Sequence, residues 1–311
     1  MKKKLFFIVG PTAAGKTETA LALAKILKTE IISCDAMQVY KEVSILTAKP
    51  SAQALKKIKH HLVGNVSVKE NFDVFTFRKK VLKAIAEIEK KKKIPLIVGG
   101  SGLYMSILLD GIFEEKDQGR NLKVRKKIEQ EIKDKGREAV YQRLEEVDPV
   151  SAAKIHINDT RRIVRALEVF EVYGKPMSLL CPKREGLFEK YDVKVFVITM
   201  KREDLYQRIN ARVDKMFEEG AVEEVKRLRK KKISQTASGI IGLKEIRMLF
   251  EDKISKDEAK ELIKKNTRHY AKRQLTWFRK DKRLTWVEVT PGESPVQNVK
   301  KIMKLMEKAN V

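Results

Sequence analysis

Residues 5–17 read LFFIVGPTAAGKT, so a five-residue apolar run leads directly into the pattern GxxxxGK(S/T). The apolar run predicts a buried strand, and the residues that follow Thr17 carry a helical pattern. In a strand–loop–helix unit of this kind the glycines let the backbone curl so that its N–H groups point inward, and the helix adds the positive end of its dipole. The segment therefore predicts a phosphate-binding loop, and a diphosphate is the ligand that it indicates.

Each residue type in this loop has a physical purpose. Lys16 supplies a mobile positive charge for the outer phosphate, and the Thr17 hydroxyl is placed to hold Mg2+. A glycine-rich turn that binds nothing is the alternative, and the strand and helix on either side of the loop argue against it. We expect the diphosphate to contact the whole loop: Gly10, Pro11, Thr12, Ala13, Ala14, Gly15, Lys16 and Thr17.

Composition indicates a soluble globular protein of one large or two modest domains, since 42% of the 311 residues are hydrophobic and 35% are charged. The formal net charge is +26, a field large enough to attract a polyanion, so nucleic acid is the first expected partner. Single lysine runs such as Lys90–Lys93 are typical of solvated helix ends, but the total excess is harder to explain in that way.

The chain carries no signal of export or membrane insertion. Cys34 and Cys181 form no CxxC pair, and the apolar run near the N-terminus ends at Val9, which is too short for a signal peptide. No segment approaches the length of a membrane span. We expect a cytoplasmic monomer.

Apolar periodicity predicts an α/β fold. Strands are predicted over 5–9, 30–33, 95–98 and 193–198, and helices with apolar stripes stand between and after them. Strand and helix in this alternation predict a parallel sheet flanked by helices on both faces. Ser255 and Glu258 form a capping-box pair that opens a helix to about Phe278, and a last helix is expected around 299–306.

A second, all-helical subdomain is predicted as an insertion into the sheet domain. Between about Phe113 and Tyr191 the segments are charged and helical, and no strand pattern stands out. We therefore assign 1–113 and 191–311 to a P-loop core with C-terminal helices, and 114–190 to a helical insertion.

Asp35 stands just past the second predicted strand. The carboxyl ends of parallel strands share one edge of a sheet, so this carboxylate is expected on the same edge as the phosphate loop, where ligands bind. Spacing alone leaves three roles open: a metal ligand, a general base or a helix N-cap. The strand at 95–98, where a metal-binding aspartate of a P-loop NTPase would be sought, ends in glycine instead.

Further motifs stand in a fixed order along most of the chain. They are SCDAMQVY at 33–40, TAKP at 47–50, HHL at 60–62, GGSGLY at 99–104, NDTRRIVRALE at 158–168, Arg208 with RVD at 212–214, and TRHYAKRQLTW at 267–277. Together with the phosphate loop, these motifs resemble the bacterial tRNA dimethylallyltransferases, also called tRNA delta-2-isopentenylpyrophosphate transferases. Four residues depart from that family's usual pattern, namely Ala36, Gly64, Ser101 and Leu243, and none removes an implied catalytic group.

The resemblance implies transfer of a dimethylallyl group from dimethylallyl diphosphate to the exocyclic N6 of adenine 37, beside the anticodon of tRNAs that read codons beginning with U. The product would be N6-isopentenyladenosine. Asp35 is implied as the base that takes the N6 proton, Thr12 as a second contact to the amine, and Arg212 as the arginine on the departing diphosphate. Mg2+ on Thr17 is the implied cofactor.

The target base has to leave the stack of the anticodon loop to reach such a pocket, so basic and aromatic side chains are expected on the tRNA. Trp277 fits a core role and an RNA role equally well, and His60 and His61 are expected to pack or hydrogen-bond rather than bind metal. The implied tRNA contacts are Asp35, Ala36, Met37, Gln38, Ser101, Arg125, Arg161, Arg162, Arg165, Gly242, Lys272, Arg273, Gln274, Trp277 and Arg279. A small-molecule kinase of the P-loop type is the alternative enzyme, and an inactive RNA-binding module is a third reading.

Overall fold

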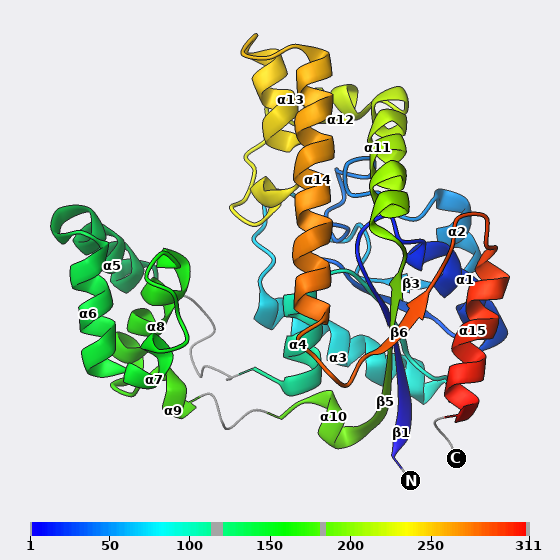
Figure 1. Ribbon diagram of the computed structural model, residues 1–311, viewed down its shortest axis with the longest axis horizontal. Helices are drawn as coiled ribbons and strands as arrows, with labels where there is room; N and C mark the ends of the chain where they lie inside the picture. The colour runs from blue at the N-terminus through cyan, green and yellow to red at the C-terminus, as the bar shows by residue number, and fades with distance from the viewer. Residues whose placement is uncertain (1, 113–120, 181–184, 309–311) are drawn as a thin grey trace. The chain divides into compact units, whose positions relative to one another are not determined.

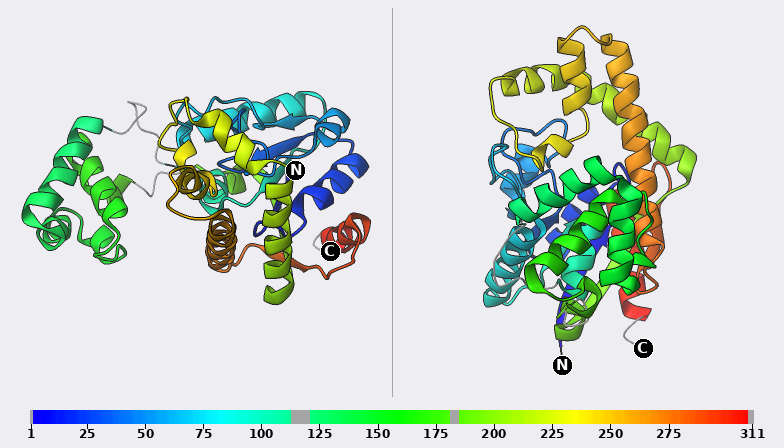
Figure 2. Two further views of the ribbon diagram at one scale, coloured as in Figure 1. Left: turned by 90° about the horizontal axis from the view of Figure 1, so that it is seen from above. Right: turned by 90° about the vertical axis from the view of Figure 1, so that its left-hand side faces the viewer.

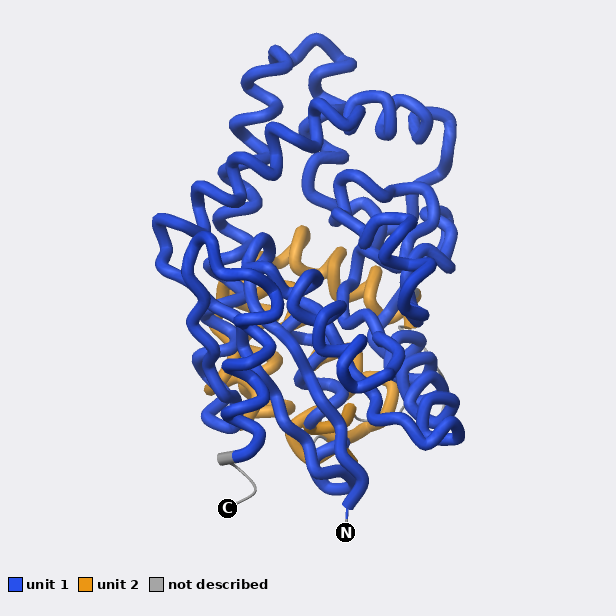
Figure 3. Tube along the Cα trace, turned by 90° about the vertical axis from the view of Figure 1, so that its right-hand side faces the viewer, with its two compact units in different colours: residues 1–109, 187–311 blue, residues 110–186 orange. Residues whose placement is uncertain are grey.

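The computed structural model describes residues 2–112, 121–180 and 185–308, which form two compact units. Unit 1 comprises Met1–Leu109 and Leu187–Val311, and unit 2 comprises Asp110–Gly186 (Figure 3). The boundary predicted at 113, and Cys181, lie outside the described residues. Helix α10 (Leu187–Lys190) falls within the predicted insertion, but it packs against β5 (Tyr191–Thr199) and belongs to unit 1.

Unit 1 is built on a six-stranded, all-parallel sheet in the order β3-β2-β4-β1-β5-β6 (Figure 1). This confirms the predicted α/β class. The strands are β1 (Lys3–Val9), β2 (Ile31–Cys34), β3 (His60–His61), β4 (Leu96–Gly99), β5 (Tyr191–Thr199) and β6 (Thr285–Glu288). The two edge strands were not predicted, because β3 has two residues and β6 has four with only Val287 buried.

Helices cover both faces of the sheet. Along β1, Leu5, Phe7 and Val9 pack into the core on one face, whereas Phe6 and Ile8 pack into the core on the other. A strand buried on both faces reads as a continuous apolar run, which is why the sequence signal was strong. The first face is covered by α3 (Val74–Lys90) and α4 (Gly102–Asp110), and the second by α1 (Lys16–Ile26) and α15 (Pro295–Lys308).

The remaining helices of unit 1 include α11 (Arg202–Glu218), α13 (Leu243–Phe250) and the long helix α14 (Lys256–Phe278). Helices α11 and α13 both pack against the long helix α14 (Figures 1 and 2). The predicted capping box at the start of α14 is confirmed, since Ser255 Oγ accepts from Glu258 N at 3.2 Å and Glu258 Oε2 accepts from Ser255 N at 2.7 Å. These elements are α2 (Ala52–Lys57), α10, α11 (Arg202–Glu218), α12 (Ala221–Leu228), the 3-10 helix η1 (Ala237–Gly239), α13 (Leu243–Phe250) and α14 (Lys256–Phe278).

Unit 2 is helical throughout its described residues, as the charged, strand-poor sequence predicted. Its core is formed by residues such as Ile128 of α5, Leu144 of α6 and Leu167 of α8. Its helices are α5 (Leu122–Lys135), α6 (Arg137–Val147), α7 (Pro149–Ala152), α8 (Thr160–Tyr173) and α9 (Met177–Leu180). Across the part of the chain that the structure describes, no helix is long and apolar enough to cross a membrane.

Candidate active site

The loop between β1 and α1 has the backbone of an anion cradle. Gly10 has φ of 147°, and a Cβ there would overlap the carbonyl oxygen of Ile198 on β5. Gly15 has φ of 86° and precedes the first residue of α1. Both glycines therefore occupy conformations that other residues rarely adopt, and the loop ends at a helix N-terminus.

Lys16 is held inside this loop rather than extended into solvent. Its Nζ donates to the carbonyl oxygen of Pro11 at 2.7 Å. The pKa of Lys16 is lowered to about 8, chiefly by burial and also by the positive charge of Arg212, while the negative charges of Asp35 and Glu18 oppose the shift. The folded chain thus keeps a cation where cations are unfavourable, which is what a site for a multiply charged anion requires.

Lys16→Met is expected to stabilise the protein without ligand at pH 7 by about 1–3 kcal/mol, because the folded pKa of about 8 lies below the ordinary 10.5. Between these two pKa values the unfolded chain binds more protons, so the stability of the parent rises with pH there and is lowest below pH 8. Thermal melting at pH 7 and pH 9.5 measures both effects. Lys25→Met, on the exposed side of α1, is the control, and a lower melting temperature for Lys16→Met at pH 7 would contradict the expectation.

Asp35 follows the last residue of β2, at the same edge of the sheet as the phosphate loop. Its Oδ1 accepts from Met37 N at 2.8 Å and from Gln38 N at 3.2 Å, so this oxygen stabilises a turn and not a helix N-terminus. Within the described residues, no group donates to Oδ2. One oxygen orients the carboxylate and the other remains available for a proton.

Arg212 lies half-buried on α11, and its charge is coupled to this site. Burial lowers the pKa of its guanidinium, the charges of Glu18 and Asp35 oppose that shift, and Arg208 adds to it. Arg208 lies one helical turn earlier, and its Nη2 is 3.7 Å from the position that a Cβ on Gly15 would take. Arg208 was not predicted as a site residue, although its spacing of four residues from Arg212 puts both on one helix face.

The run Gly99–Gly102 is a packing surface. A Cβ on Gly99 would overlap Cys34 on β2, one on Gly100 would overlap Gln274, and one on Gly102 would overlap the indole of Trp277. Small residues here let β2 and α14 approach the end of β4 closely.

Two residues that were predicted to touch tRNA are engaged within the protein. Gln274 is 5% exposed, and its amide bonds with Thr12 N and with the carbonyl oxygen of Gly100. Trp277 is half-buried over Gly102, and its Nε1 donates to Ser106 Oγ at 3.1 Å. The structure thus shows a buried hydrogen-bonding role for Gln274 and a packing role for Trp277, and the tRNA contacts of both residues stay predictions.

The remaining predicted residues near Asp35 also make local contacts. Met37 is half-buried, with Cε 3.4 Å from a Cβ placed on Gly239, and Gln38 Nε2 donates to Ala48 O at 3.2 Å. Ser101 Oγ accepts from Tyr104 N in the first turn of α4. Gly242 is buried at the start of α13.

A pair of the predicted arginines in unit 2 gathers around one carboxylate. Glu168 is 0% exposed, and its Oε2 lies 3.2 Å from Arg165 Nη1 and 3.8 Å from Arg125 Nη1. Arg161 and Arg162 are exposed on the same helix, α8. In unit 1, Lys272 and Arg273 are exposed near the end of α14, and Arg279 is exposed at its C-cap.

The histidine pair hydrogen-bonds, as predicted. His61 Nε2 lies 2.8 Å from Glu30 Oε2, and His60 Nδ1 lies 2.7 Å from the carbonyl oxygen of Ile58. Among the described residues, no group of three or more His, Cys, Asp or Glu side chains is arranged to hold a metal. The Thr17 hydroxyl makes no hydrogen bond to the described residues. Mg2+ in proteins often takes only one or two protein oxygens, with substrate phosphates and water as its other ligands, and a single threonine hydroxyl fits that pattern.

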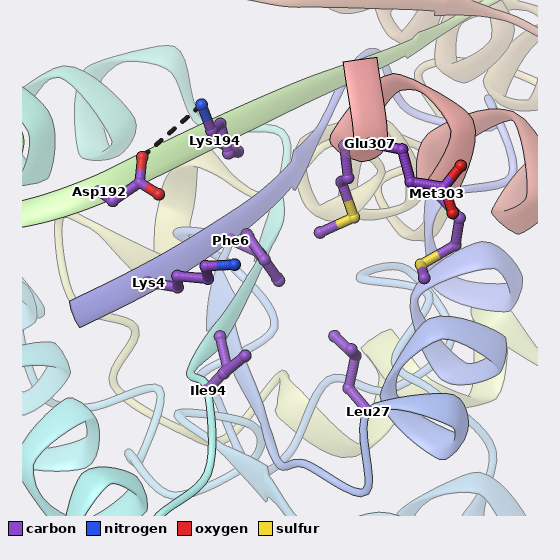
Figure 4. A pocket seen from close by; sticks show the side chains of 9 residues that line it. Lys4, Phe6, Leu27, Ile94, Asp192, Lys194, Met303 and Glu307 are labelled. Atoms are coloured by element: carbon purple, nitrogen blue, oxygen red, sulfur yellow. Dashed lines mark ion pairs between the residues drawn. The ribbon is translucent and has the colours of Figure 1, made fainter. Parts of the chain in front are cut away.

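Two hollows differ in their relation to the phosphate loop. A narrow one lies beside Thr17, with Ser33, Gln38 and Val98 in its wall. A cavity of about 220 Å³ lies at the opposite, amino-terminal edge of the sheet, between Phe6, Leu27 and Ile94 and the side chain of Met303 (Figure 4). The second cavity is therefore separate from the phosphate loop.

Comparison with known proteins gives consistent matches over nearly the whole chain. Residues 38–281 match the family model described as IPP transferase. The tRNA dimethylallyltransferases of Carboxydothermus hydrogenoformans and Geobacter sulfurreducens are 43% and 44% identical, and the matches cover 93% and 92% of both chains, respectively. A tRNA isopentenylpyrophosphate transferase of Bacillus halodurans has a similar structure, with a TM-score of 0.69, 36% identity and 99% coverage of both chains. A eukaryotic dimethylallyltransferase acting on tRNA gives a TM-score of 0.81 at 28% identity, with 97% of this chain and 77% of that chain covered.

Proposed function

The chain belongs to the IPP transferase family, and from this membership and the geometry of the site we propose that it transfers a dimethylallyl group from dimethylallyl diphosphate to N6 of adenine 37 in tRNA. It is an enzyme of the tRNA dimethylallyltransferase class. None of the relatives described above is named as a kinase, so the kinase alternative has no support from them.

The observation that carries the proposal is the convergence of Lys16 at the start of α1, Asp35 after β2 and Arg212 on α11: the charges of Asp35 and Arg212 both act on Lys16, and the charge of Asp35 acts on Arg212. Two cations and the loop's N–H groups suit a diphosphate, and a carboxylate with one unpaired oxygen suits a proton acceptor. Nothing in this set requires ATP: the leaving group would be the diphosphate itself.

In the proposed step, N6 of adenine attacks the allylic carbon while the bond from that carbon to the diphosphate oxygen breaks. Negative charge then develops on the diphosphate, where the loop N–H groups, Lys16 and Arg212 stabilise it. Mg2+ held by Thr17 would add positive charge beside the same oxygens. Asp35 Oδ2 takes the proton that N6 loses, and the Thr12 hydroxyl would hold the amine in line with the carbon.

We propose that tRNA is bound by cations of both units. Lys272, Arg273 and Arg279 of unit 1, and Arg161 and Arg162 of unit 2, are exposed and suited to phosphate contacts. Glu168 would hold Arg125 and Arg165 in fixed positions for the same purpose. The adenine would leave the stack of the anticodon loop to reach Asp35.

The decisive experiment is incubation of the purified protein with unmodified tRNA, dimethylallyl diphosphate and Mg2+, followed by mass analysis of the nucleosides. The proposal requires a prenylated adenosine and release of one diphosphate per transfer. Release of diphosphate without a prenylated nucleoside, or phosphoryl transfer from ATP to a small molecule, would overturn it.

The affinity for tRNA is expected to fall steeply with salt, whereas the affinity for the diphosphate should change much less. Each phosphate contact releases condensed counterions, so Arg161→Ala and Lys272→Ala should each reduce the log–log salt slope by about 0.7 for a single-stranded contact. Dissolved salt screens the enclosed contacts around Lys16 much less than it screens exposed charges. Binding titrations over a range of salt concentrations measure the slopes.

Lys304→Ala is the control for these titrations, because Lys304 is an exposed lysine on α15, a helix that packs on α1 and carries none of the predicted tRNA contacts. Its slope should match that of the parent. Parent-like slopes for both Arg161→Ala and Lys272→Ala would place the polyanion surface elsewhere on the protein.

A further inference from the structure

Gln274 links two backbone segments that border the candidate active site. Its Oε1 accepts from Thr12 N at 2.9 Å, and its Nε2 donates to the carbonyl oxygen of Gly100 at 2.8 Å. Thr12 lies in the phosphate loop after β1, and Gly100 follows β4, the strand paired with β1. One buried amide therefore fixes the loop to the end of the neighbouring strand.

The bond to Thr12 decides the direction of one of the loop's amides. A phosphate loop binds anions through N–H groups that point inward, so the position of each peptide plane matters. The Thr12 N–H is committed to Gln274, which anchors the loop at its second residue after Gly10. The remaining N–H groups and Lys16 are then oriented from that fixed point.

Helix α14 holds Gln274 firmly in place. Tyr270, Gln274 and Trp277 follow one another at spacings of four and three residues, so they share one face of the helix. Trp277 covers Gly102 and donates to Ser106 on α4, and Ala271 packs in the core. Lys272 and Arg273 are exposed outside this face. These contacts hold this face of the helix against the sheet domain, and side chains held by packing are what a well-aligned binding loop needs.

We propose that Gln274 is a positioning residue of the diphosphate site, which sets the shape of the phosphate loop through Thr12 and Gly100. The inference rests on the proposed function for the identity of the anion, a prenyl diphosphate. Gln274 does not contact the reacting atoms; it acts through the loop that holds them.

Two substitutions disturb this amide independently. Gln274→Ala removes both hydrogen bonds. Gly100→Ala leaves Gln274 in the chain, but its Cβ would overlap Nε2 of Gln274 and displace that flexible side chain, while the nearest other atom, the carbonyl oxygen of Gly10, would be 3.2 Å away. Each variant should bind inorganic diphosphate with Mg2+ about tenfold to a hundredfold more weakly, since small errors in alignment have effects of this size.

The double variant separates positioning from general damage. In Gln274→Ala the overlap of the new Cβ with Nε2 is gone, and the nearest remaining atom is the carbonyl oxygen of Gly10 at 3.2 Å, so adding Gly100→Ala should lower diphosphate affinity much less than it does in the parent. Calorimetric titration measures the affinity of the folded protein, and tRNA affinity should stay within about twofold of the parent value if only the loop is disturbed. Independent, additive losses would show that Gly100 acts through its own backbone and would overturn the proposal.

Asn266→Ala is the matched control. Asn266 lies on the same helix, and its Nδ2 donates to Glu245 Oε1 at 2.6 Å, so the variant also loses a side-chain amide but away from the loop. Its diphosphate affinity should equal that of the parent. If Gln274→Ala matched Asn266→Ala, Gln274 would serve only to pack α14. Inorganic diphosphate needs no tRNA, so this test also stands apart from the result of the prenylation assay.

Discussion

Asp35→Asn is expected to lower the single-turnover rate of prenyl transfer by about a hundredfold to ten-thousandfold, the usual effect of removing a general base. The structure indicates that this substitution removes the proton acceptor and leaves the local backbone unchanged. The amide oxygen of asparagine can keep the bonds that Oδ1 accepts from Met37 N and Gln38 N, so the turn after β2 is retained. Only the oxygen proposed to take the proton is replaced. Mass analysis of tRNA from quenched single-turnover reactions measures the rate.

Asp73→Asn is a matched control for the loss of a carboxylate, because Asp73 Oδ1 accepts from Thr76 N at the start of α3 and lies outside the site. Its rate should equal that of the parent. Affinity for tRNA should be nearly unchanged in both variants. An Asp35→Asn rate within severalfold of the parent rate would show that Asp35 supports the turn and does not act as the base.

Arg212→Ala is expected to lower kcat/KM for dimethylallyl diphosphate by about a hundredfold to a thousandfold, the range seen when one preorganised donor to a developing anion is removed. A guanidinium can pair bidentately with diphosphate oxygens, and the bond strengthens as their charge grows. Burial of Arg212 reduces screening by solvent, which increases this contribution. Steady-state kinetics with donor varied at saturating tRNA measures the effect.

Arg212→Lys keeps the charge but loses the planar pair of donors, so an intermediate kcat/KM is expected. Arg202→Ala is the control on the same helix: Arg202 is exposed and stacks on Tyr206, with Cζ 5.1 Å from the ring centroid. A loss of tRNA affinity with normal donor kinetics in Arg212→Ala would move Arg212 to the RNA surface.

Local sequence signals were sufficient for the core of the fold. Strands such as 5–9 are buried on both faces, and helices such as α11 carry apolar residues at each turn. Because buried positions are apolar, they produce a sequence pattern with the period of the strand or helix. The pattern weakened where burial was slight. The two-residue β3 and the mostly exposed β6 depend on neighbouring strands for their hydrogen bonds. Such pairing joins segments that are far apart in the chain, so the local sequence pattern does not predict it.

Some residues of the candidate site could likewise be predicted from local sequence, whereas others depend on the tertiary structure. The phosphate loop and Asp35 were found from local sequence, because glycine spacing and a strand end are local features. Arg212 was assigned by resemblance, and only the fold brings its charge into the field of Lys16 and Asp35. The partner of a side chain is a long-range property: Gln274 bonds to Thr12, 262 residues away, and no periodicity on α14 predicts that bond.

By itself, the sequence determined an α/β core, a helical insertion and a glycine-rich loop between a strand and a helix, because glycine conformation and apolar periodicity act over short stretches of chain. Tertiary structure alone decided which polar groups meet. Glu224 illustrates this, since its buried carboxylate accepts from Ser44 N, Ile45 N and Leu46 N at 2.6–3.0 Å and fixes a loop 178 or more residues away. A buried polar group must find a partner wherever the fold supplies one, and that partner is chosen by packing rather than by sequence separation.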